Sequence, residues 1–369
     1  MSVTKLLCSK QSCRWAFALL FCVAIVSPVS CGGGTGQNGG GGGGSQQSWD
    51  FFRIVNASIA PVTIQYAYAP SMILKDGVYH VFFCSGGNIF PAWDYIRYVK
   101  STDGGQTWSD PVDMLRATAF NGNDLAACDP SVVFFQGFYY MYYGSANTTG
   151  SNSFQTVVQV ARSTAIDGPY LTYTQRGTWE DLPDDPQVII KPLVTRSHAP
   201  TGYGAGQPSV VVLNGKLLMW YTDDSEQEAA ADGDFTIFRL YMLESSDPVI
   251  WTPDPIRQTS IRGQDSPDVK YDATGNRFVV TWVSNMFTNN ASLTRAYSSD
   301  GLTWGTTQTL NPAGRFPPYT HNAGEGSDET GHLIPAASKT IIGFGAPYSL
   351  SQVNSLGNWD LYGVFVDSP

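Results

Sequence analysis

Four segments of this chain begin in the same way, and their spacing constrains the fold more than any other feature. Each has one residue, then proline, then two runs of β-branched and aromatic residues joined by a short turn. They start at Ala69-Pro70, Asp129-Pro130, Gln207-Pro208 and Ser266-Pro267, so their prolines are 60, 78 and 59 residues apart. The β-branched and aromatic residues that follow favour strands, and proline is tolerated at the first residue of a strand. Repeats of this size, each one antiparallel sheet, are typical of β-propellers.

A fifth, weaker copy lacks the proline, and we expect its inner strand at Gly331–Ile334 and the next strand at Thr340–Phe344. The sequence therefore predicts an all-β fold over residues 49–369, a five-bladed β-propeller of four-stranded antiparallel blades. After Phe344 there is only one clear further strand, residues 360–366, so the last blade is incomplete. We expect the N-terminal strand near Phe51–Val55 to complete it and close the ring.

The first 30 residues have the pattern of a signal peptide. Three basic residues, the last of them Arg14, precede an apolar run of 12 residues from Trp15 to Val26. This run is too short to span a bilayer, which takes about 20 residues. We therefore expect residues 1–30 to be removed and the protein to be extracellular or held at the cell surface.

The next segment, residues 31–48, is rich in Gly, Ser and Gln, as in flexible linkers. It begins at Cys31, and the residues around this cysteine resemble the lipidation motif of bacterial lipoproteins. This resemblance implies a lipid on Cys31, a tether that lets the domain reach past a membrane surface, and a location in the outer membrane or periplasm. Plain secretion is the alternative.

The charge of the chain excludes one class of partner. Three of the 21 basic side chains and none of the 31 acidic ones lie before Cys31, which leaves the mature chain at −13. Nucleic-acid binding needs a basic surface, so nucleic acid is not expected as a partner. We expect a monomer that meets a membrane only through its lipid anchor.

Two cysteines remain in the propeller domain. Cys84 ends a strand of the first repeat and Cys128 opens the second repeat, so in a propeller both lie on the same face of neighbouring blades. An oxidising compartment favours a disulfide between them. Two unpaired buried thiols are the alternative.

The turn after the third strand of the first repeat, Ser101–Trp108, matches the Ser-x-Asp-x-Gly-x-x-Trp pattern of sialidase-type Asp boxes. Shorter versions contain Asp247 with Trp251 and Asp300 with Trp304. The aspartate is expected to bond its own turn, so these motifs are interpreted as structural. A sialidase is a third functional hypothesis, but its acidic substrate needs an arginine cluster. Most arginines here fall in strands that face the blade exterior.

In a propeller the innermost strands of the blades surround a central channel, so the residues just before each inner strand converge on one end of it, here called the upper end. Carboxylates gathered there suit glycoside hydrolysis. One carboxylic acid protonates the leaving oxygen while another carboxylate activates water. The candidate catalytic residues are Asp129, Asp265, Asp268 and Glu325. The candidate substrate-binding residues, chosen for stacking or hydrogen bonding to sugars, are Tyr66, Tyr68, Trp93, Gln207, His321 and Trp359. The segment 177–206, which holds several acidic residues, is expected to form one wall of the site.

Residues 50–367 resemble glycoside hydrolase family 43 and its relatives, which include arabinanases, β-xylosidases, arabinofuranosidases and the family 32 fructosidases. The Asp-Pro-Ser strand opening, the five repeats and the Ser-x-Asp…Trp turns carry this resemblance. It implies an Asp base, an Asp that orients and tunes, and a Glu acid, all at the starts of inner strands. By motif it implies Asp129 as base or orienting carboxylate and, more loosely, Glu325-Gly326 as the acid. By position alone it implies Asp265 or Asp268 as the tuning partner.

The chain departs from the family pattern at two positions. Ala69 stands where the family has its base, and Gln207, which cannot transfer protons, opens the third repeat. Two hypotheses follow: an inverting hydrolase of a neutral glycan, and a catalytically inactive propeller that binds glycan or protein at the cell surface. No cofactor is required for either. The resemblance also implies that a histidine such as His332 holds a structural calcium ion in the channel.

Overall fold

The computed structural model describes residues 51–57, 65–87, 94–118, 124–148, 154–193, 204–223, 239–252, 257–310, 316–335, 337–347 and 358–369. Within these ranges the regular elements are all strands, arranged in five antiparallel sheets. The same ranges contain no helix with the length and apolarity that crossing a bilayer requires. The predicted signal peptide, the tether with Cys31, and Trp93 lie outside the described residues.

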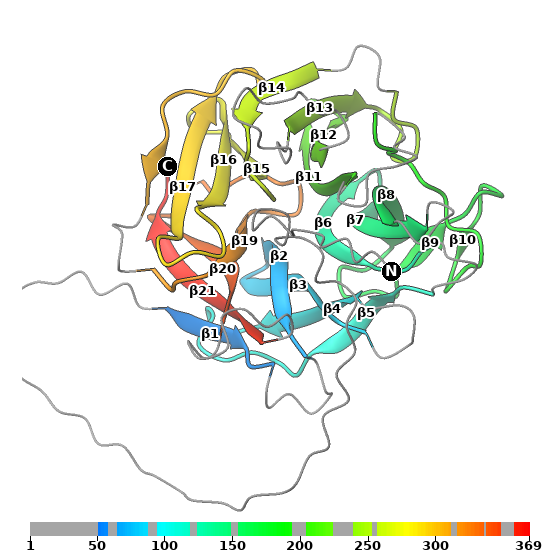
Figure 1. Cartoon of the computed structure of the whole chain (residues 1–369), viewed down its shortest axis with the longest axis horizontal. Helices are drawn as coiled ribbons and strands as arrows, with labels where there is room; N and C mark the ends of the chain where they lie inside the picture. The colour runs from blue at the N-terminus through cyan, green and yellow to red at the C-terminus, as the bar shows by residue number, and fades with distance from the viewer. Residues whose placement is uncertain are drawn as a thin grey trace, which may run out of the picture. The chain divides into compact units, whose positions relative to one another are not determined.

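The five sheets follow one another along the chain as blades around a central channel (Figure 1). The first blade has β2 (Ala67–Lys75), β3 (Val78–Gly86), β4 (Asp94–Ser101) and β5 (Val112–Arg116). The second has β6 (Cys128–Phe135), β7 (Phe138–Thr148), β8 (Phe154–Ser163), β9 (Leu171–Tyr173) and β10 (Trp179–Glu180). The third has β11 (Ala205–Leu213), β12 (Lys216–Asp223), β13 (Arg239–Ser245) and β14 (Arg257–Arg262).

The fourth blade has β15 (Asp268–Asp272), β16 (Arg277–Ser284), β17 (Ser292–Ser298) and β18 (Gln308–Thr309). The fifth has β19 (His321–Glu325), β20 (Lys339–Pro347), β21 (Trp359–Asp367) and β1 (Phe52–Val55). The N-terminal β1 is thus the outer strand of the last blade, with Phe52 opposite Gly363, and in Figure 1 blue β1 lies beside red β21. The five-bladed fold and the closing role of the N-terminal strand are confirmed.

The strands β2, β6, β11, β15 and β19 are innermost in their blades and surround the channel (Figure 1). Apolar side chains fill the space between neighbouring blades, so each of the five blade interfaces has its own core. Between the first two blades, for example, Phe82 and Tyr95 pack with Met141 and Tyr143, all at most 1% exposed. We call the end of the ring where the inner strands begin the upper face, and the opposite end the lower face.

The predicted inner strand of the fifth blade was wrong. That strand is β19, His321–Glu325, and the expected strand at Gly331–Ile334 lies beyond it. The reason is local: Asn322-Ala323 stands where the other four blades have a residue followed by proline. Without a proline, nothing in the sequence marks the start of a strand there.

Residues 326–333, which we call the basal strap, run along the lower ends of the other four inner strands. Backbone carbonyls of the strap accept hydrogen bonds from each of those strands in turn. The bonds are Leu74 N to Ser327 O (2.8 Å), Phe134 N to Glu329 O (2.6 Å), Val212 N to Thr330 O (2.9 Å) and Tyr271 N to Gly331 O (3.0 Å). The strap therefore spans the lower end of the channel, and a ligand has to approach from the upper face.

The acidic stretch after β9, residues 179–185, lies at the outer edge of the second blade and does not form a wall of the site. Trp179 and Glu180 form β10 at the outer edge of the second blade. Arg176 pairs with Glu180, Asp184 and Asp185 there, and Arg162 lies between the rings of Phe138 and Trp179. These acidic residues are engaged at the blade edge, whereas residues 194–203 lie outside the described ranges.

The turns at the lower face have the internal bonds expected of them. Asp103 Oδ1 accepts hydrogen bonds from Ser101 Oγ at 2.8 Å and Thr107 N at 2.9 Å. Asp300 bonds Ser298, Leu302 and Thr303 in the same manner. Both aspartates serve their own turns.

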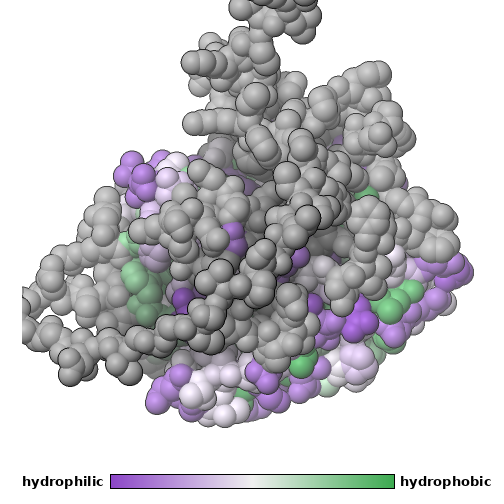
Figure 2. Space-filling model, turned by 60° about the horizontal axis from the view of Figure 1, so that its bottom comes forward, coloured by the Kyte–Doolittle hydropathy of each residue, from purple (hydrophilic) through white to green (hydrophobic). Residues whose placement is uncertain are grey.

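In Figure 2 the described part of the surface is a mixture of hydrophilic residues and separate hydrophobic ones.

Candidate functional site

Five residues, one from each blade, occupy equivalent positions at the upper mouth of the channel. Each has a left-handed backbone with φ between 47° and 53°, and each stands directly before the proline, or before Ala323 in the fifth blade. They are Ala69, Asp129, Gln207, Ser266 and Asn322. Non-glycine residues rarely adopt such angles, and strained backbone of this kind clusters at functional sites. The repeated turn brings one side chain from every blade to the same ring.

All five residues line one cavity of about 40 Å³, together with the prolines and Asp268. At about 10–15 Å³ for each water, this space has room for about three waters or one small ion. A sugar ring is larger than that. The cavity is therefore too small to enclose a sugar ring.

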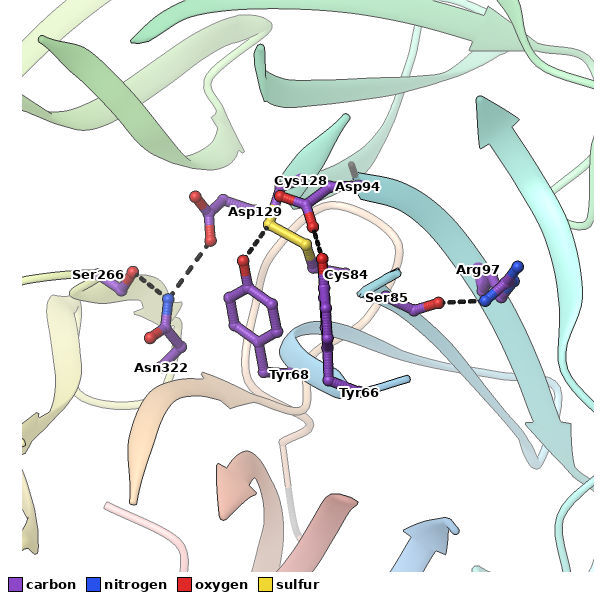
Figure 3. The surroundings of a disulfide bond; sticks show 10 residues. All are labelled: Tyr66, Tyr68, Cys84, Ser85, Asp94, Arg97, Cys128, Asp129, Ser266 and Asn322. Atoms are coloured by element: carbon purple, nitrogen blue, oxygen red, sulfur yellow. Dashed lines mark hydrogen bonds between the residues drawn. A yellow bond between two sulfur atoms is a disulfide. The ribbon is translucent and has the colours of Figure 1, made fainter. Parts of the chain in front are cut away.

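Hydrogen bonds join four of the five mouth residues across blades. Asn322 Nδ2 donates to Ser266 Oγ at 2.7 Å and to Asp129 Oδ1 at 3.3 Å (Figure 3). Gln207 Oε1 accepts from the backbone N–H of Ser266 at 2.9 Å and from Thr222 Oγ1 at 2.6 Å. Because its oxygen is engaged by protein donors, Gln207 has only its amide N–H groups to offer a ligand. Asp129 is the one carboxylate among the five.

A disulfide stands directly beside Asp129. Cys84, near the end of β3, is bonded to Cys128, the first residue of β6 (Figure 3). The bond joins the first two blades at the upper face, which decides between the two alternatives left open by the sequence. The hydroxyl of Tyr68 lies 3.0 Å from Cys128 Sγ and is the donor, since disulfide sulfur carries no hydrogen. The disulfide thus brings Tyr68 of the first blade next to the residue that precedes Asp129 in the second (Figure 3).

Asp94, the first residue of β4, is a buried carboxyl that sequence reasoning missed. Its Oδ1 accepts a short hydrogen bond from the hydroxyl of Tyr66, and the residue is 7% exposed (Figure 3). Burial raises the pKa of Asp94 to about 7, although the bond from Tyr66 opposes this. Its backbone carbonyl also accepts from Ala127 N at 3.1 Å, one residue before the disulfide. The protonated form of the Asp94 side chain is therefore present up to nearly neutral pH.

Three of the predicted substrate-binding aromatics lie together with His321 at the mouth. The ring of His321 is 4.1 Å from Trp359 and 5.2 Å from Tyr68 between centroids, and Tyr66 contacts both Tyr68 and Trp359. Burial lowers the pKa of His321 to about 3, and the backbone of Tyr319 offsets this only in part. The imidazole is therefore neutral. This group of aromatic rings carries no charge at physiological pH.

The structure does not place Glu325 where the sequence analysis put it. Glu325 ends β19 instead of opening it, and it is 0% exposed. Its two carboxylate oxygens accept hydrogen bonds from Arg295 Nη2 at 2.5 Å and Thr281 Oγ1 at 2.6 Å. A general acid has to reach the leaving oxygen of the substrate. This carboxylate instead forms a buried ion pair between the fourth and fifth blades.

Asp268 lines the cavity but its oxygens are engaged by three protein groups. Oδ1 accepts from Ser209 Oγ at 2.8 Å and Lys270 Nζ at 2.7 Å, and Oδ2 accepts from Glu325 N at 2.7 Å. The side chain thereby joins the third, fourth and fifth blades. This arrangement fits a structural tie better than a proton-transfer group. Asp265 lies three residues earlier, before Ser266, and is partly buried.

His332, the residue expected at a metal, lies in the basal strap. Its Nε2 is 2.7 Å from the carbonyl oxygen of Val212, so this nitrogen carries the hydrogen of that bond. Among the described residues, the one set of three potential metal ligands close together is Cys84, Asp94 and Cys128. Its two cysteines are joined in the disulfide. As folded, that set does not offer thiolates to a metal.

The mouth residues that the sequence missed share one position in the repeat. Ser266 directly precedes a proline, as Asp129 does, so the repeat motif marks its position. Asn322 has alanine after it and carried no such signal. Phe287 comes from a loop between β16 and β17, stacks on His321 at 4.9 Å, and belongs to no repeat motif.

Comparisons with known proteins agree with this architecture. No protein-family model matches the chain, and no curated protein matches it. Among solved structures, the catalytic domain of a family 62 α-L-arabinofuranosidase from Coprinopsis cinerea has a TM-score of 0.58 at 16% identity, covering 87% of this chain and 97% of that one. A thermostable family 43 glycoside hydrolase has a TM-score of 0.57 at 15% identity over 82% and 93% of the two chains. The chain has the fold of these glycosidase propellers.

A third match extends the comparison to another family. A family 117 glycoside hydrolase from the marine bacterium Zobellia galactanivorans has a TM-score of 0.57 at 15% identity, covering 86% of this chain and 90% of that one. These identities are low, so the likeness is one of fold. The chain spans nearly the full length of all three structures.

Proposed function

We propose that the protein binds a neutral glycan at the upper mouth of the propeller and hydrolyses its glycosidic bonds by carboxylate chemistry. The observation that carries the proposal is the mouth itself, where Asp129 stands in a ring of hydrogen-bonding side chains next to uncharged aromatic rings. Carboxylates activate water or protonate leaving groups, and aromatic rings bind the apolar faces of sugars. The fold shared with glycosidase propellers supports this function.

In this proposal Asp129 activates the attacking water by accepting its proton, and Asp265 is the second carboxyl group, which donates a proton to the leaving oxygen. Glu325 and Asp268, also candidates from the sequence, are assigned to structural bonds because protein donors engage them. Inverting hydrolysis places the two carboxyl groups about 6.5–9.5 Å apart, with water between one of them and the sugar. Stereochemistry of the first product, followed by NMR, tests the inverting assignment.

A panel of neutral oligosaccharides and aryl glycosides tests the function. Xylo- and cello-oligosaccharides belong in it, because related propellers have been crystallised with xylotriose and cellotriose. We expect Asp129→Asn to lower kcat by at least about 100-fold, the lower range for general acid–base groups, with little change in substrate binding. Equal turnover by wild type and Asp129→Asn would remove Asp129 from the mechanism.

A second function, glycan binding without hydrolysis, is favoured by the other mouth residues. Ala69, Gln207, Ser266 and Asn322 occupy the remaining four positions, and none of them transfers protons as a carboxyl group does. Binding of oligosaccharide by wild type without turnover would establish this alternative. The Ala69→Asp variant then tests whether a carboxylate at the position of the family's base gives the protein turnover. Aspartate tolerates the left-handed backbone of residue 69 better than alanine does, so the fold should accept it.

The sialidase hypothesis is not supported by the arginines. Arg97 bonds Asp113 and Ser85, Arg295 bonds Glu325, and Arg162 lies between two aromatic rings. A substrate carboxylate needs arginines that are free to meet it. Arg97 and Arg162 are engaged within their own blades, and Arg295 is engaged by Glu325 of the neighbouring blade.

We also propose that the protein acts outside the cytoplasm, anchored through Cys31 or secreted. The Cys84–Cys128 disulfide supports an oxidising compartment. Metabolic labelling with a fatty-acid analogue, compared between wild type and Cys31→Ser, tests the anchor. Label in both proteins or in neither would leave plain secretion.

A structural calcium ion also stays a proposal, and hydrolysis by carboxylates does not require it. Calcium prefers oxygen ligands. The mouth cavity, lined by Asp129 and Ser266, fits this preference better than His332, whose Nε2 faces a backbone carbonyl. Metal analysis of the purified protein, and the effect of EDTA on its melting temperature, test the ion.

A further inference from the structure

Phe287 is a large apolar residue that the structure leaves exposed at the upper mouth. It lies between β16 and β17 and is 40% exposed. The described residues include four other exposed large hydrophobic side chains, namely Val112, Leu182, Ile250 and Phe365. Among these five, Phe287 alone has ring contacts with the mouth aromatics, at 4.9 Å to His321 and 6.1 Å to Trp359.

The backbone of Phe287 is held in an unfavourable conformation. Its φ is +57°, and that of Asn285, two residues earlier, is +53°. Asparagine tolerates the left-handed region, but for a bulky residue such as phenylalanine it is a true outlier. Strain of this kind persists only where the surrounding structure imposes it. The fold thus accepts a cost in stability to place this ring.

Hydrogen bonds between the loop and the approach to β19 impose the conformation. Tyr319 N donates to Thr288 O at 2.8 Å, and Phe287 N donates to Thr320 O at 3.4 Å. Within the loop, Thr288 Oγ1 donates to Asn285 O at 2.7 Å. These bonds fix the loop against the residues that lead into His321, so one face of the Phe287 ring stacks on the imidazole with an interplanar angle of 28°.

The chemistry around Phe287 selects a type of ligand. Its neighbours are the rings of His321, Trp359 and, beyond them, Tyr68, none of which is charged. A ring with one face packed and its remainder exposed, next to a ring of hydrogen-bonding groups, matches the C–H face of a sugar whose hydroxyl groups face the channel.

We propose that Phe287 is a stacking platform that binds one sugar ring of a neutral glycan beside the mouth cavity. This inference rests on the proposed function, because it assumes that a glycan reaches the mouth. It adds the residue that selects for an uncharged sugar face. It also explains why a strained phenylalanine stands at this position.

Calorimetric titration of purified protein with xylo- and cello-oligosaccharides is the first test. We expect Phe287→Ala to weaken binding roughly tenfold, and Phe287→Trp, which keeps an aromatic face, to stay within about threefold of wild type. Phe365→Ala is the matched control, since Phe365 is 36% exposed on β21 and packs on Phe52 at the outer strand. The control should bind as wild type does.

The backbone strain gives a second, independent readout. Glycine adopts positive φ without penalty, so Phe287→Gly should be more stable than Phe287→Ala, the reverse of the usual order, while both bind glycan equally poorly. Urea denaturation of the two variants measures this difference.

The outcomes separate the inference from the function on which it rests. If wild type binds a glycan and Phe287→Ala binds it equally well, the platform is refuted and the proposed function stands. If wild type neither binds nor cleaves any neutral glycan, both are refuted. A Phe287→Gly variant less stable than Phe287→Ala would overturn the claim that strain is tolerated for binding.

Discussion

Arg295 Nη2 donates a hydrogen bond to Glu325 Oε1 at 2.5 Å, and the two side chains are 2% and 0% exposed. This pair links β17 of the fourth blade to β19 of the fifth. An uncompensated buried charge is costly, so removing one partner of such a pair typically costs about 3–5 kcal/mol. The residue that the sequence analysis proposed as an acid instead holds two blades together.

We expect Glu325→Gln to lower the free energy of unfolding by about 3–5 kcal/mol, because the Arg295 guanidinium would stay buried without its counter-charge. Urea denaturation measures the loss. Replacing both residues with apolar ones, Arg295→Met with Glu325→Leu, should recover much of it. A Glu325→Gln protein of wild-type stability that had lost only its hydrolytic activity would return Glu325 to the catalytic site.

Asp94 gives the stability of the protein a pH dependence of defined sign. Its pKa is raised from 3.8 to about 7, so between these values the folded state holds a proton that the unfolded state has released. The free energy of unfolding therefore falls as the pH rises from about 4 to about 7. A shift of about three units corresponds to on the order of 4 kcal/mol. We expect Asp94→Asn, which keeps an acceptor for Tyr66, to gain most over wild type at pH 8.

Denaturation at several pH values between 5 and 8 measures the stability difference between Asp94→Asn and wild type. If this difference stayed constant with pH, Asp94 would already be ionised at pH 5.

His321 gives the free energy of unfolding the opposite pH dependence, because its pKa is lowered from 6.5 to about 3. Its contribution to stability is present above pH 6.5 and is lost as the pH falls toward 3. His321→Phe should therefore reduce the loss of stability between about pH 6.5 and pH 3 and leave the stability above pH 6.5 independent of this group. Denaturation over that range measures the effect.

The disulfide is expected to make a large contribution to stability. Cys84 and Cys128 are 44 residues apart, and closing a loop of that length restricts the unfolded chain by about 4 kcal/mol at 25 °C. We expect the Cys84→Ser, Cys128→Ser double variant to lose about this much in urea denaturation. Reducing agent should destabilise wild type to a similar degree and leave the double variant unchanged. Insensitivity of wild type to the reductant would contradict the assignment.

Asp328 organises the basal strap, and its loss should be felt across the ring. Oδ1 accepts hydrogen bonds from Thr330 N, Thr330 Oγ1 and His332 N, at 2.7–2.9 Å. These donors are partly buried, and removing an acceptor that leaves such donors unpaired costs up to about 1–3 kcal/mol. We expect Asp328→Ala to lose that amount and Asp328→Asn, which retains an oxygen at the position, to lose less. Equal losses in the two variants would show that charge, not hydrogen bonding, matters here.

The repeats made most of the fold predictable. Proline after a left-handed residue marks the start of four inner strands, and the short final blade required β1 from the N-terminus. The fifth inner strand could not be found, because Asn322-Ala323 makes the same turn with φ +47° but lacks the proline. Different residue types adopt this left-handed turn, so the turn cannot be recognised from residue type in a single sequence.

The candidate site was predictable in position but less so in its residues. Asp129, Tyr66 and Tyr68 could be predicted because they stand at the starts of inner strands, and Trp359 because it ends a loop on the upper face. Glu325 was misplaced because its register depended on the misplaced strand. Phe287 and Asp94 were missed because burial and contacts between blades, which composition does not reveal, give them their character.

The basal strap changes how the molecule should come apart. In a ring of similar sheets, each blade contacts only its two neighbours, so unfolding could begin where the ring is closed and proceed one blade at a time. Here a single stretch of the fifth blade is bonded to the inner strands of the other four. Loosening any one of them disturbs a segment that all of them share, so the sheets should melt together in one concerted transition.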